Sequence, residues 1–438
     1  MGQDRGTENW AGNQQCRPDE VARPRSVDEL AARVSAAAAA GDRVKTIGAG
    51  HSFTGAAMTD GVLVRLDDMP TELRVDPPSG RAMVGAGMRL ADLNRALHTR
   101  GRALPNLGDI DVQTVAGATA TATHGTGLHL GNLSSGITGL ELITGTGDVV
   151  WCDAETEPEL FAAARVGIGA LGVVTRVELE TVPAFNLRSV ETAEVVEELL
   201  ADWDGFVASA AHAEFFWMPG TRRALVKRND PTTEEPGRFT ERRVKAEKLL
   251  LENLAFGAAM RTVRRFPGSR DRVQKVLGSA VSSSERVGRS YEVFASPRHV
   301  RFMEMEYGLP IDAVPEAFRR VQEVVAELPE PPSFPIEVRV SAADDIPLST
   351  AQGRTSGWIA VHRYKGTDHD PYFRAVEAIM NDYDGRPHWG KWHYQTAATL
   401  QPRYPEWDRF AAVRGRVDPV GTFANDYLDR VLGPVEVR

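Results

Sequence analysis

Residues 48–54 read Gly-Ala-Gly-His-Ser-Phe-Thr and follow directly on residues 43–47, whose alternating Val, Thr and Ile pattern predicts a short strand. Glycines at the end of a strand let backbone amides approach an anion closely, and such a turn can hold a pyrophosphate. His51 stands in this turn, where it could face a bound cofactor. The alternative is a tight turn with a surface histidine, which the motif favours when it is taken alone.

A second run of small side chains covers residues 117–127, Gly-Ala-Thr-Ala-Thr-Ala-Thr-His-Gly-Thr-Gly. Small side chains fill a core poorly, but they let the backbone lie against a large flat ligand, with threonine hydroxyls and free amides to bind it. A flexible linker is the alternative interpretation. The apolar flanking residues Val115 and Ile137 argue against a linker, which would continue into polar sequence.

Residues 167–172, Gly-Ile-Gly-Ala-Leu-Gly, spell a dinucleotide-binding fingerprint. That fingerprint binds pyrophosphate only when a strand precedes it and a helix follows it. Here the order is reversed, because residues 159–165 have a helical pattern and residues 173–179 alternate like a strand. We therefore reject a Rossmann-type NAD site.

Two further groups of residues carry chemistry in the C-terminal half. Residues 386–393, Arg-Pro-His-Trp-Gly-Lys-Trp-His, favour cofactor contact over zinc, because their two histidines are five apart without a nearby carboxylate or cysteine pattern. A surface turn with a buried tryptophan is the simpler alternative. Glu337 and Arg339 share one face of the strand-like residues 336–340. They could orient a hydroxylated substrate and take its proton, although a plain salt bridge is favoured when the pair is taken alone.

The composition excludes several classes of protein. The 438 residues are 42% hydrophobic and 25% charged, enough for two domains with a sizeable core. A net charge of -9 argues against a nucleic-acid partner and an anionic lipid partner. Cys16 and Cys152 form neither a disulfide framework nor a metal site and suit a reducing compartment. With no secretory signal and no transmembrane segment, we expect a cytoplasmic protein, compatible with peripheral membrane contact.

The order of predicted elements indicates an α+β fold. A helix over residues 27–40, with Ser26 and Glu29 at capping-box spacing and Gly41 behind it, begins an alternation of helices and strands. Its other members are strands at 62–66 and 81–85 and a helix at 90–99. After Pro183 longer helices are predicted at 191–200 and 240–262, with a polar loop at 229–237 and a proline-rich break at 329–335. We place a domain boundary near 183, and residues after about 385 are again rich in Gly, His and aromatics.

Taken together, these motifs resemble the vanillyl-alcohol-oxidase-type flavoproteins and, among them, most closely the aldonolactone oxidases and dehydrogenases that act on L-gulono-1,4-lactone or D-arabinono-1,4-lactone. The resemblance runs from Asn9-Trp10-Ala11-Gly12 to Asn425-Asp426-Tyr427, nearly the whole chain. It implies a two-part FAD-binding domain of the PCMH type in residues 1–183, an α+β cap or substrate domain in residues 184–385, and a C-terminal segment, residues 386–438, that returns to the flavin.

The resemblance also implies the residues that bind FAD. His51 matches the family's covalent histidine, which bonds the 8α carbon of the flavin. Gly48, Ala49, Gly50 and Ser52 are expected to line the pyrophosphate. The other side would be lined by Thr114, Gly117, Ala118, Thr121, His124 and Gly125. Gly172 and Val174 would hold the adenine end. Gly108 and Asp109 would lie beside the flavin, where the glycine leaves room for oxygen. Alditol oxidases have a serine at the position of Asp109, so the carboxylate favours a lactone.

By the same resemblance the catalytic residues are Glu337, Arg339, Lys391 and His362, with Lys391 also at the flavin N1 and C2 carbonyl. They imply oxidation of a sugar 1,4-lactone at the C2 hydroxyl, with hydride transfer to flavin N5 and an ascorbate-like product. Dioxygen or another electron acceptor would then reoxidise the flavin. The alternative from the same superfamily is an alditol oxidase acting on xylitol or sorbitol. A flavin-binding protein without turnover is disfavoured, because a pure binder would need none of these catalytic residues.

Overall fold

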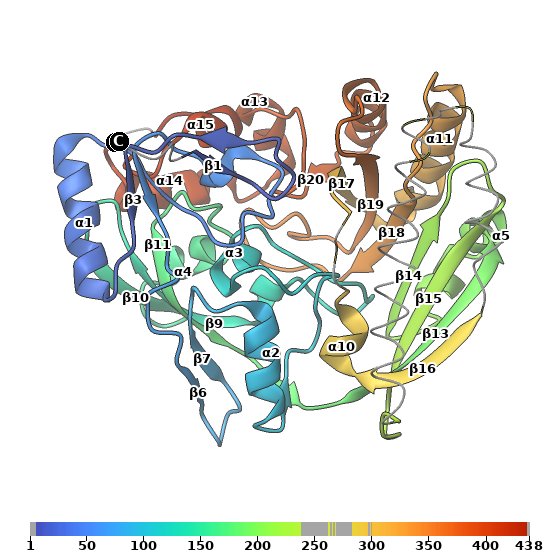
Figure 1. Cartoon of the computed structure of the whole chain (residues 1–438), viewed down its shortest axis with the longest axis horizontal. Helices are drawn as coiled ribbons and strands as arrows, with labels where there is room; N and C mark the ends of the chain where they lie inside the picture. The colour runs from blue at the N-terminus through green and yellow to red at the C-terminus, as the bar shows by residue number, and fades with distance from the viewer. Residues whose placement is uncertain are drawn as a thin grey trace.

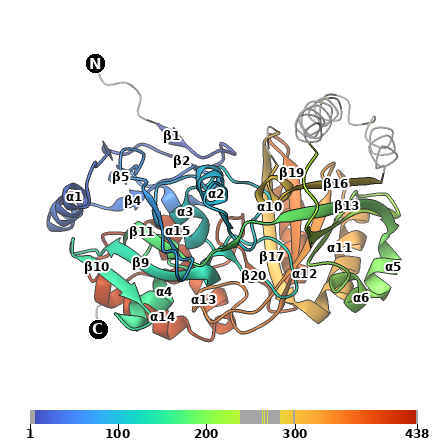
Figure 2. The ribbon, with the colours of Figure 1, turned by 90° about the horizontal axis from the view of Figure 1, so that it is seen from below.

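The computed structural model describes residues 6–237, 283–296, 298 and 300–435, together with the single positions 262, 265 and 268. The N-terminal strands and helices and the C-terminal helices occupy one side of the molecule (Figure 1). A large sheet with its own helices occupies the other side, and a second view shows the same division (Figure 2). Within the described residues, no helix has the length and apolar character needed to cross a membrane.

A small parallel sheet carries the glycine turn. Its strands are β3 (Glu20–Ala22), β5 (Val62–Val64) and β4 (Val44–Thr46), in that order. Helix α1 (Val27–Ala40) precedes β4 and confirms the predicted helix. Ser26 Oγ accepts a hydrogen bond from the Glu29 amide at 3.1 Å, and Gly41 ends the helix in the left-handed region.

A five-stranded sheet forms the second layer of this side. Its strands, in sheet order, are β10 (Val149–Asp153), β9 (Ile137–Ile143), β11 (Val173–Leu179), β7 (Ala82–Gly85) and β6 (Leu73–Val75). Its accompanying helices are α2 (Leu90–His98), α3 (Val115–Ala120) and α4 (Pro158–Ala164). Because α4 comes before residues 167–172 and β11 after them, the order of elements is the reverse of a Rossmann fingerprint, as predicted.

The other side is built on an eight-stranded sheet. Its strands, in sheet order, are β16 (Ser284–Arg289), β13 (Asn186–Val195), β15 (Arg223–Thr232), β14 (His212–Trp217), β18 (Ile336–Ser341), β19 (Ser356–Tyr364), β17 (Phe302–Pro310) and β20 (Arg386–Pro387). Its helices are α5 (Val196–Ala201), α6 (Trp203–Val207), α10 (Ser290–Phe294), α11 (Val314–Glu327) and α12 (Asp370–Asn381).

The two faces of this sheet differ sharply in chemistry. Alternate residues of the central strands, such as Met305, Val338 and Val361, pack with Phe318 of α11 and Phe373 of α12 in one apolar core. Several intervening residues of the same strands, among them Glu306, Arg339 and His362, are charged or titratable and are buried on the opposite face. A buried polar face needs partners, so this second face is where a functional site is expected.

Three sequence predictions for this region need correction or lie outside the described residues. Residues 191–195 are strand rather than helix, because this end of β13 pairs with β15 as far as Val195, and α5 begins only at Val196. The predicted loop at 229–237 is strand as far as Thr232 for the same reason. The helix predicted at 240–262 lies almost wholly outside the described residues.

The C-terminal segment packs against the N-terminal side. Helices α14 (Trp407–Val417) and α15 (Asp426–Leu432) share a hydrophobic core with α4, and the short helix α13 (Ala397–Leu400) joins them. The amide of Val44 in β4 donates to the carbonyl of Thr422 at 2.8 Å. The remaining short strands are β1 (Thr7–Glu8), β2 (Gln15–Cys16), β8 (Arg102–Ala103) and β12 (Val182–Pro183).

Candidate active site

A cavity with about 1320 Å³ of atom-free space, its open mouth included, lies within the N-terminal side. Its walls come from residues 45–58, 113–121 and 164–174, with Phe423 from the C-terminal segment. Ten of the expected cofactor-binding residues line it: Gly48, Ala49, Gly50, His51, Ser52, Thr114, Gly117, Thr121, Gly172 and Val174. Segments far apart in the sequence therefore meet around one space large enough for a dinucleotide cofactor.

The glycines of this cavity are required by close contacts between chain segments. A Cβ on Gly48 would stand 2.3 Å from Oγ1 of Thr114, the residue whose hydroxyl caps α3 by accepting from the Gly117 amide at 3.2 Å. A Cβ on Gly172 would stand 2.5 Å from the carbonyl oxygen of Ile143. Because side chains are absent at these points, main-chain atoms form much of the wall, as expected where a backbone approaches a phosphate-bearing ligand.

The threonine-rich run differs in part from the expectation. Residues 115–120 form α3, and the hydroxyls of Thr119 and Thr121 donate to carbonyls one turn back, at 3.1 Å to Val115 and 3.3 Å to Gly117. These hydroxyls thus donate to their own helix, a common arrangement for threonine within a helix. Ala118 faces the hydrophobic core and not the cavity.

His51 lies at the cavity wall with its ring stacked against Trp10, at 5.1 Å between ring centroids. Burial, with smaller contributions from Arg89 and Lys391, lowers the pKa of His51 to about 4. The imidazole is therefore neutral at physiological pH and keeps a nitrogen lone pair. A neutral histidine is the form that can act as a nucleophile.

Lys45 and Ile168 are two of the cavity residues that were not predicted from the sequence as cofactor contacts. Lys45 is fully buried, and its ammonium donates to the carbonyls of Gly169 at 2.9 Å and Phe423 at 3.1 Å. Ile168 also lines the cavity, so the rejected fingerprint touches the cofactor space from a helix-to-strand connection. The available signal for Lys45 was a lysine at the centre of a short strand, between Val44 and Thr46.

The charged face of the large sheet holds a second cluster, centred on Arg339. Its Nε lies 3.2 Å from Oε1 of Glu337, and its Nη1 lies 4.0 Å from Oδ1 of Asp109. Its Nη2 pairs with the carboxylate of Glu306. The register explains this convergence, because Ala360 stands opposite both Glu306 and Glu337 and leaves the space between them free for the guanidinium.

Lys391 reaches this cluster from the C-terminal segment. Its ammonium pairs with Glu304 and lies 3.8 Å from Oε2 of Glu306. The amide of Phe53, two residues beyond His51, donates to the carbonyl of Gly390 at 2.7 Å. This contact places Lys391 beside the turn that carries His51. His362 lies opposite Glu304 in the sheet, with its Nε2 3.4 Å from Oε1 of that carboxylate.

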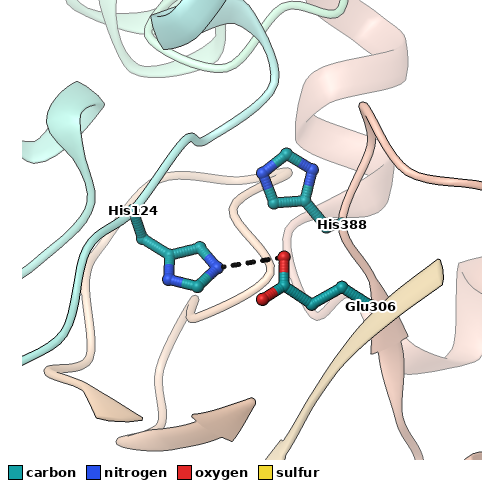
Figure 3. A group of neighbouring side chains, drawn as sticks. All are labelled: His124, Glu306 and His388. Carbon is teal, nitrogen blue, oxygen red and sulfur yellow. Dashed lines mark ion pairs between the residues drawn. The ribbon is translucent and has the colours of Figure 1, made fainter. Parts of the chain in front are cut away.

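His124, Glu306 and His388 form a third group that joins the two sides (Figure 3). Nε2 of His124 lies 3.5 Å from Oε2 of Glu306, and its ring stacks on Trp358 at 3.7 Å between centroids. Burial lowers the pKa of both histidines, that of His388 to about 3. Although three such side chains could ligate a metal, Glu306 already faces two cations, which oppose a further positive charge.

The carboxyl groups around Arg339 differ in their ionisation. Burial raises the pKa of Glu337 well above its usual range, and the nearby Asp109 and Glu214 carboxyls add to the shift. Burial also opposes ionisation of Glu306, but the attraction of Arg339, His124 and Lys391 outweighs it and holds that pKa well below the usual range. The surrounding cations therefore favour the ionised form of Glu306, whereas burial favours the protonated form of Glu337.

Gly108 and Gly125 are packed more tightly than expected. A Cβ on Gly108 would stand 3.1 Å from the carbonyl oxygen of His124, and one on Gly125 would stand 2.2 Å from that of Leu107. The glycine at 108 therefore serves the close approach of two chain segments, and the structure shows no spare room at its Cβ position. Asp109 is partly exposed and lies 3.4 Å from Arg298.

The sequence analysis missed the two carboxylates of β17, Glu304 and Glu306, and the pair formed by Glu214 and Lys227 at 3.0 Å. A signal for the first two was present in residues 303–307, Met-Glu-Met-Glu-Tyr. Glutamates that alternate with large apolar residues inside a strand indicate that one face of the strand packs in an apolar core and the other face is polar. Of the predicted catalytic residues, the structure brings Glu337, Arg339 and Lys391 together around Glu306, with His362 joined through Glu304.

Comparison with known proteins matches two parts of the chain to described families. Residues 18–153 match a family described as FAD binding domain, and residues 177–431 match D-arabinono-1,4-lactone oxidase. L-gulono-1,4-lactone dehydrogenase of Mycobacterium tuberculosis is 46% identical over 427 residues, which cover 97% of this chain and 99% of that protein. Alditol oxidase of a Streptomyces species is 34% identical, over 97% and 98% of the two chains.

The solved structures give the fold. Cholesterol oxidase from B. sterolicum superimposes with a TM-score of 0.82 over 98% of this chain and 96% of its own, at 17% sequence identity. The fold and the cofactor cavity define an FAD-dependent oxidoreductase with the FAD-binding domain of the vanillyl-alcohol-oxidase type. The chain belongs to the D-arabinono-1,4-lactone oxidase family, which confirms the resemblance seen in its three motifs.

Proposed function

We propose that this enzyme oxidises a sugar 1,4-lactone of the L-gulono or D-arabinono type at its C2 hydroxyl. The observation that supports it most strongly is the convergence of Glu337, Arg339 and Lys391 on one buried charged face beside the turn that carries His51. Bound FAD supplies the hydride acceptor, its N5 atom. In this proposal residues 1–183 and 386–438 bind the cofactor and residues 184–385 bind the lactone.

The chain's own residues would place the substrate and manage its charge. Arg339 and Lys391 would hold oxygen atoms of the lactone and stabilise negative charge that develops as the hydroxyl loses its proton. Glu337 would take that proton. Its raised pKa makes it a stronger base than an ordinary glutamate once ionised, and a general base works best with a pKa near the working pH. The rate should therefore rise with pH as Glu337 loses its own proton.

Anaerobic mixing with substrates tests this proposal. We expect L-gulono-1,4-lactone or D-arabinono-1,4-lactone to bleach the flavin absorbance near 450 nm at least ~10-fold faster than xylitol or sorbitol. Faster bleaching by the polyols would instead support the alditol oxidase alternative, to which the 34% identical relative gives weight. No bleaching by either class would refute the proposal. Comparing the rate of oxygen uptake with the rate of reduction of an artificial dye would show whether dioxygen or another acceptor reoxidises the flavin.

We also propose that the flavin is attached covalently through His51. The support is its neutral imidazole at the cavity wall. Acid precipitation of the wild-type enzyme should leave the yellow colour in the pellet, whereas His51→Ala should release it into the supernatant. His129→Ala, at an exposed histidine outside the cavity lining, is the matched control and should behave like the wild type. Colour retained in the His51→Ala pellet would exclude this histidine as the linkage.

A further inference from the structure

We propose that Glu306 is a positioning residue of this reaction: a buried anion that fixes Arg339, Lys391 and His124 relative to one another. The inference rests on the proposed function, because Arg339 and Lys391 are the residues expected to hold the substrate. Glu306 itself has no exposed side-chain surface, so it acts through these neighbours and does not touch the substrate.

Glu306 joins three separate parts of the chain at one carboxylate. Arg339 lies on the neighbouring part of the large sheet, Lys391 belongs to the C-terminal segment, and His124 follows α3 on the cofactor side. Figure 3 shows the His124 ring pointing at the Glu306 carboxylate, with a dashed line for the ion pair between them. Moving this carboxylate would therefore shift the substrate face and the cofactor side together.

The neighbouring carboxylates cannot replace Glu306. Burial favours the protonated form of Glu337, and Asp109 lies 4.0 Å from the guanidinium of Arg339. Glu304 pairs with Lys391 and His362, and the structure records no contact between it and Arg339. Glu306 is thus the ionised carboxylate closest to Arg339 and also faces Lys391. Without it, two buried cations would stand near each other with less compensating charge.

One carboxylate oxygen of Glu306 interacts with its neighbours through its charge and not through a hydrogen bond. Among the described residues, Oε2 of Glu306 and Nε2 of His124 are both buried and have no hydrogen-bond partner. Buried polar atoms without a partner are costly, and they persist at functional sites. The titratable or charged groups that face Glu306 and Lys391 are His51, His124, Glu304, Glu337, Arg339 and His388, and His362 faces Glu304.

The test compares Glu306→Gln with Glu304→Gln in the FAD-loaded enzyme. Sulfite adds to oxidised flavins, and its affinity reports positive charge beside the flavin without any lactone. Because Glu306 favours the protonated form of Lys391, Glu306→Gln should move the alkaline loss of sulfite affinity to lower pH by about one pH unit. Lys391→Met should abolish this alkaline transition, which identifies the titrating group.

With lactone, Glu306→Gln should lower kcat at least ~10-fold and change KM less, because misplaced cations cost most in the transition state. Glu304→Gln should affect the sulfite transition but leave the placement of Arg339 intact, so its kcat should fall less. Glu306→Asp keeps the charge and should restore the wild-type sulfite transition while kcat stays reduced.

Wild-type sulfite and kcat behaviour in folded, yellow Glu306→Gln would overturn the proposal. If that variant fails to fold, Glu306→Asp decides: full activity would refute positioning, and reduced kcat with an unchanged transition would support it. A wild-type enzyme that lactones do not bleach would refute the proposed function. The sulfite comparison would still test the role of Glu306 toward Lys391 in that case.

Discussion

The most informative perturbation of stability is Lys45→Met at the cofactor cavity. Lys45 is fully buried, and burial together with the nearby Arg414 lowers its pKa from 10.5 to about 7. In the unfolded chain this lysine stays protonated to much higher pH. Between these values the native state therefore binds fewer protons than the unfolded state, and the free energy of unfolding rises with pH.

The size of the effect follows from the same two values. A fully titrating group changes the free energy of unfolding by about 1.4 kcal/mol per pH unit, so Lys45 should add about 2 kcal/mol between about pH 7 and about pH 9. Urea unfolding, followed by tryptophan fluorescence, measures this as the difference between wild type and Lys45→Met at each pH. Taking the difference cancels the titration of other groups.

Lys45→Arg is the control for this experiment. Arginine keeps a charge that does not titrate in the same range, so this variant should lose the pH-dependent increment as Lys45→Met does. The free energy of unfolding of the wild type minus that of Lys45→Met should rise from about pH 7 to about pH 9. If this difference stays constant or falls, the assignment of a lowered pKa to Lys45 is refuted.

Two glycine substitutions test the packing. Gly48→Ala places a Cβ 2.3 Å from Thr114 Oγ1 and should disturb the α3 cap. The free energy of unfolding should fall by about 1 kcal/mol, and the flavin absorbance per protein should also fall. The control Gly136→Ala, with open space at its Cβ, should retain the flavin. Gly357→Ala places a Cβ 2.1 Å from Val314 Cγ2 in the apolar core and should lower the free energy of unfolding by about 1–3 kcal/mol with unchanged flavin content. Equal flavin content in Gly48→Ala, or an unchanged melting temperature in Gly357→Ala, would contradict these contacts.

Local sequence signals predicted the elements whose conformation depends on interactions between residues close together in the chain. The helix at residues 27–40 has a serine cap, an alanine-rich body and a terminal glycine, and its bounds agree with the structure. The prediction for residues 191–195 was wrong because their conformation depends on pairing with β15, a strand later in the chain, which a local pattern does not contain. The cofactor turn was predictable because glycine, histidine and the preceding strand are adjacent in the chain.

The catalytic cluster was only partly predictable, for a related reason. Glu337 and Arg339 share a strand, so the period of two reveals their common face. Glu306 reaches them only through the register of β17 on β19 and of β19 on β18, and no sequence pattern gives that register. The resemblance supplied Lys391, which lies more than fifty residues from Arg339 in the chain.

The cofactor cavity also depends on the order in which the chain is made. Phe423 forms part of its wall, its carbonyl accepts from Lys45, and Thr422 bonds the first residue of β4. Ribosomes deliver residue 45 long before residue 423, so until residue 423 emerges the glycine turn exists without its far wall. The cofactor cavity is therefore complete only when these two distant segments of the chain have both been made.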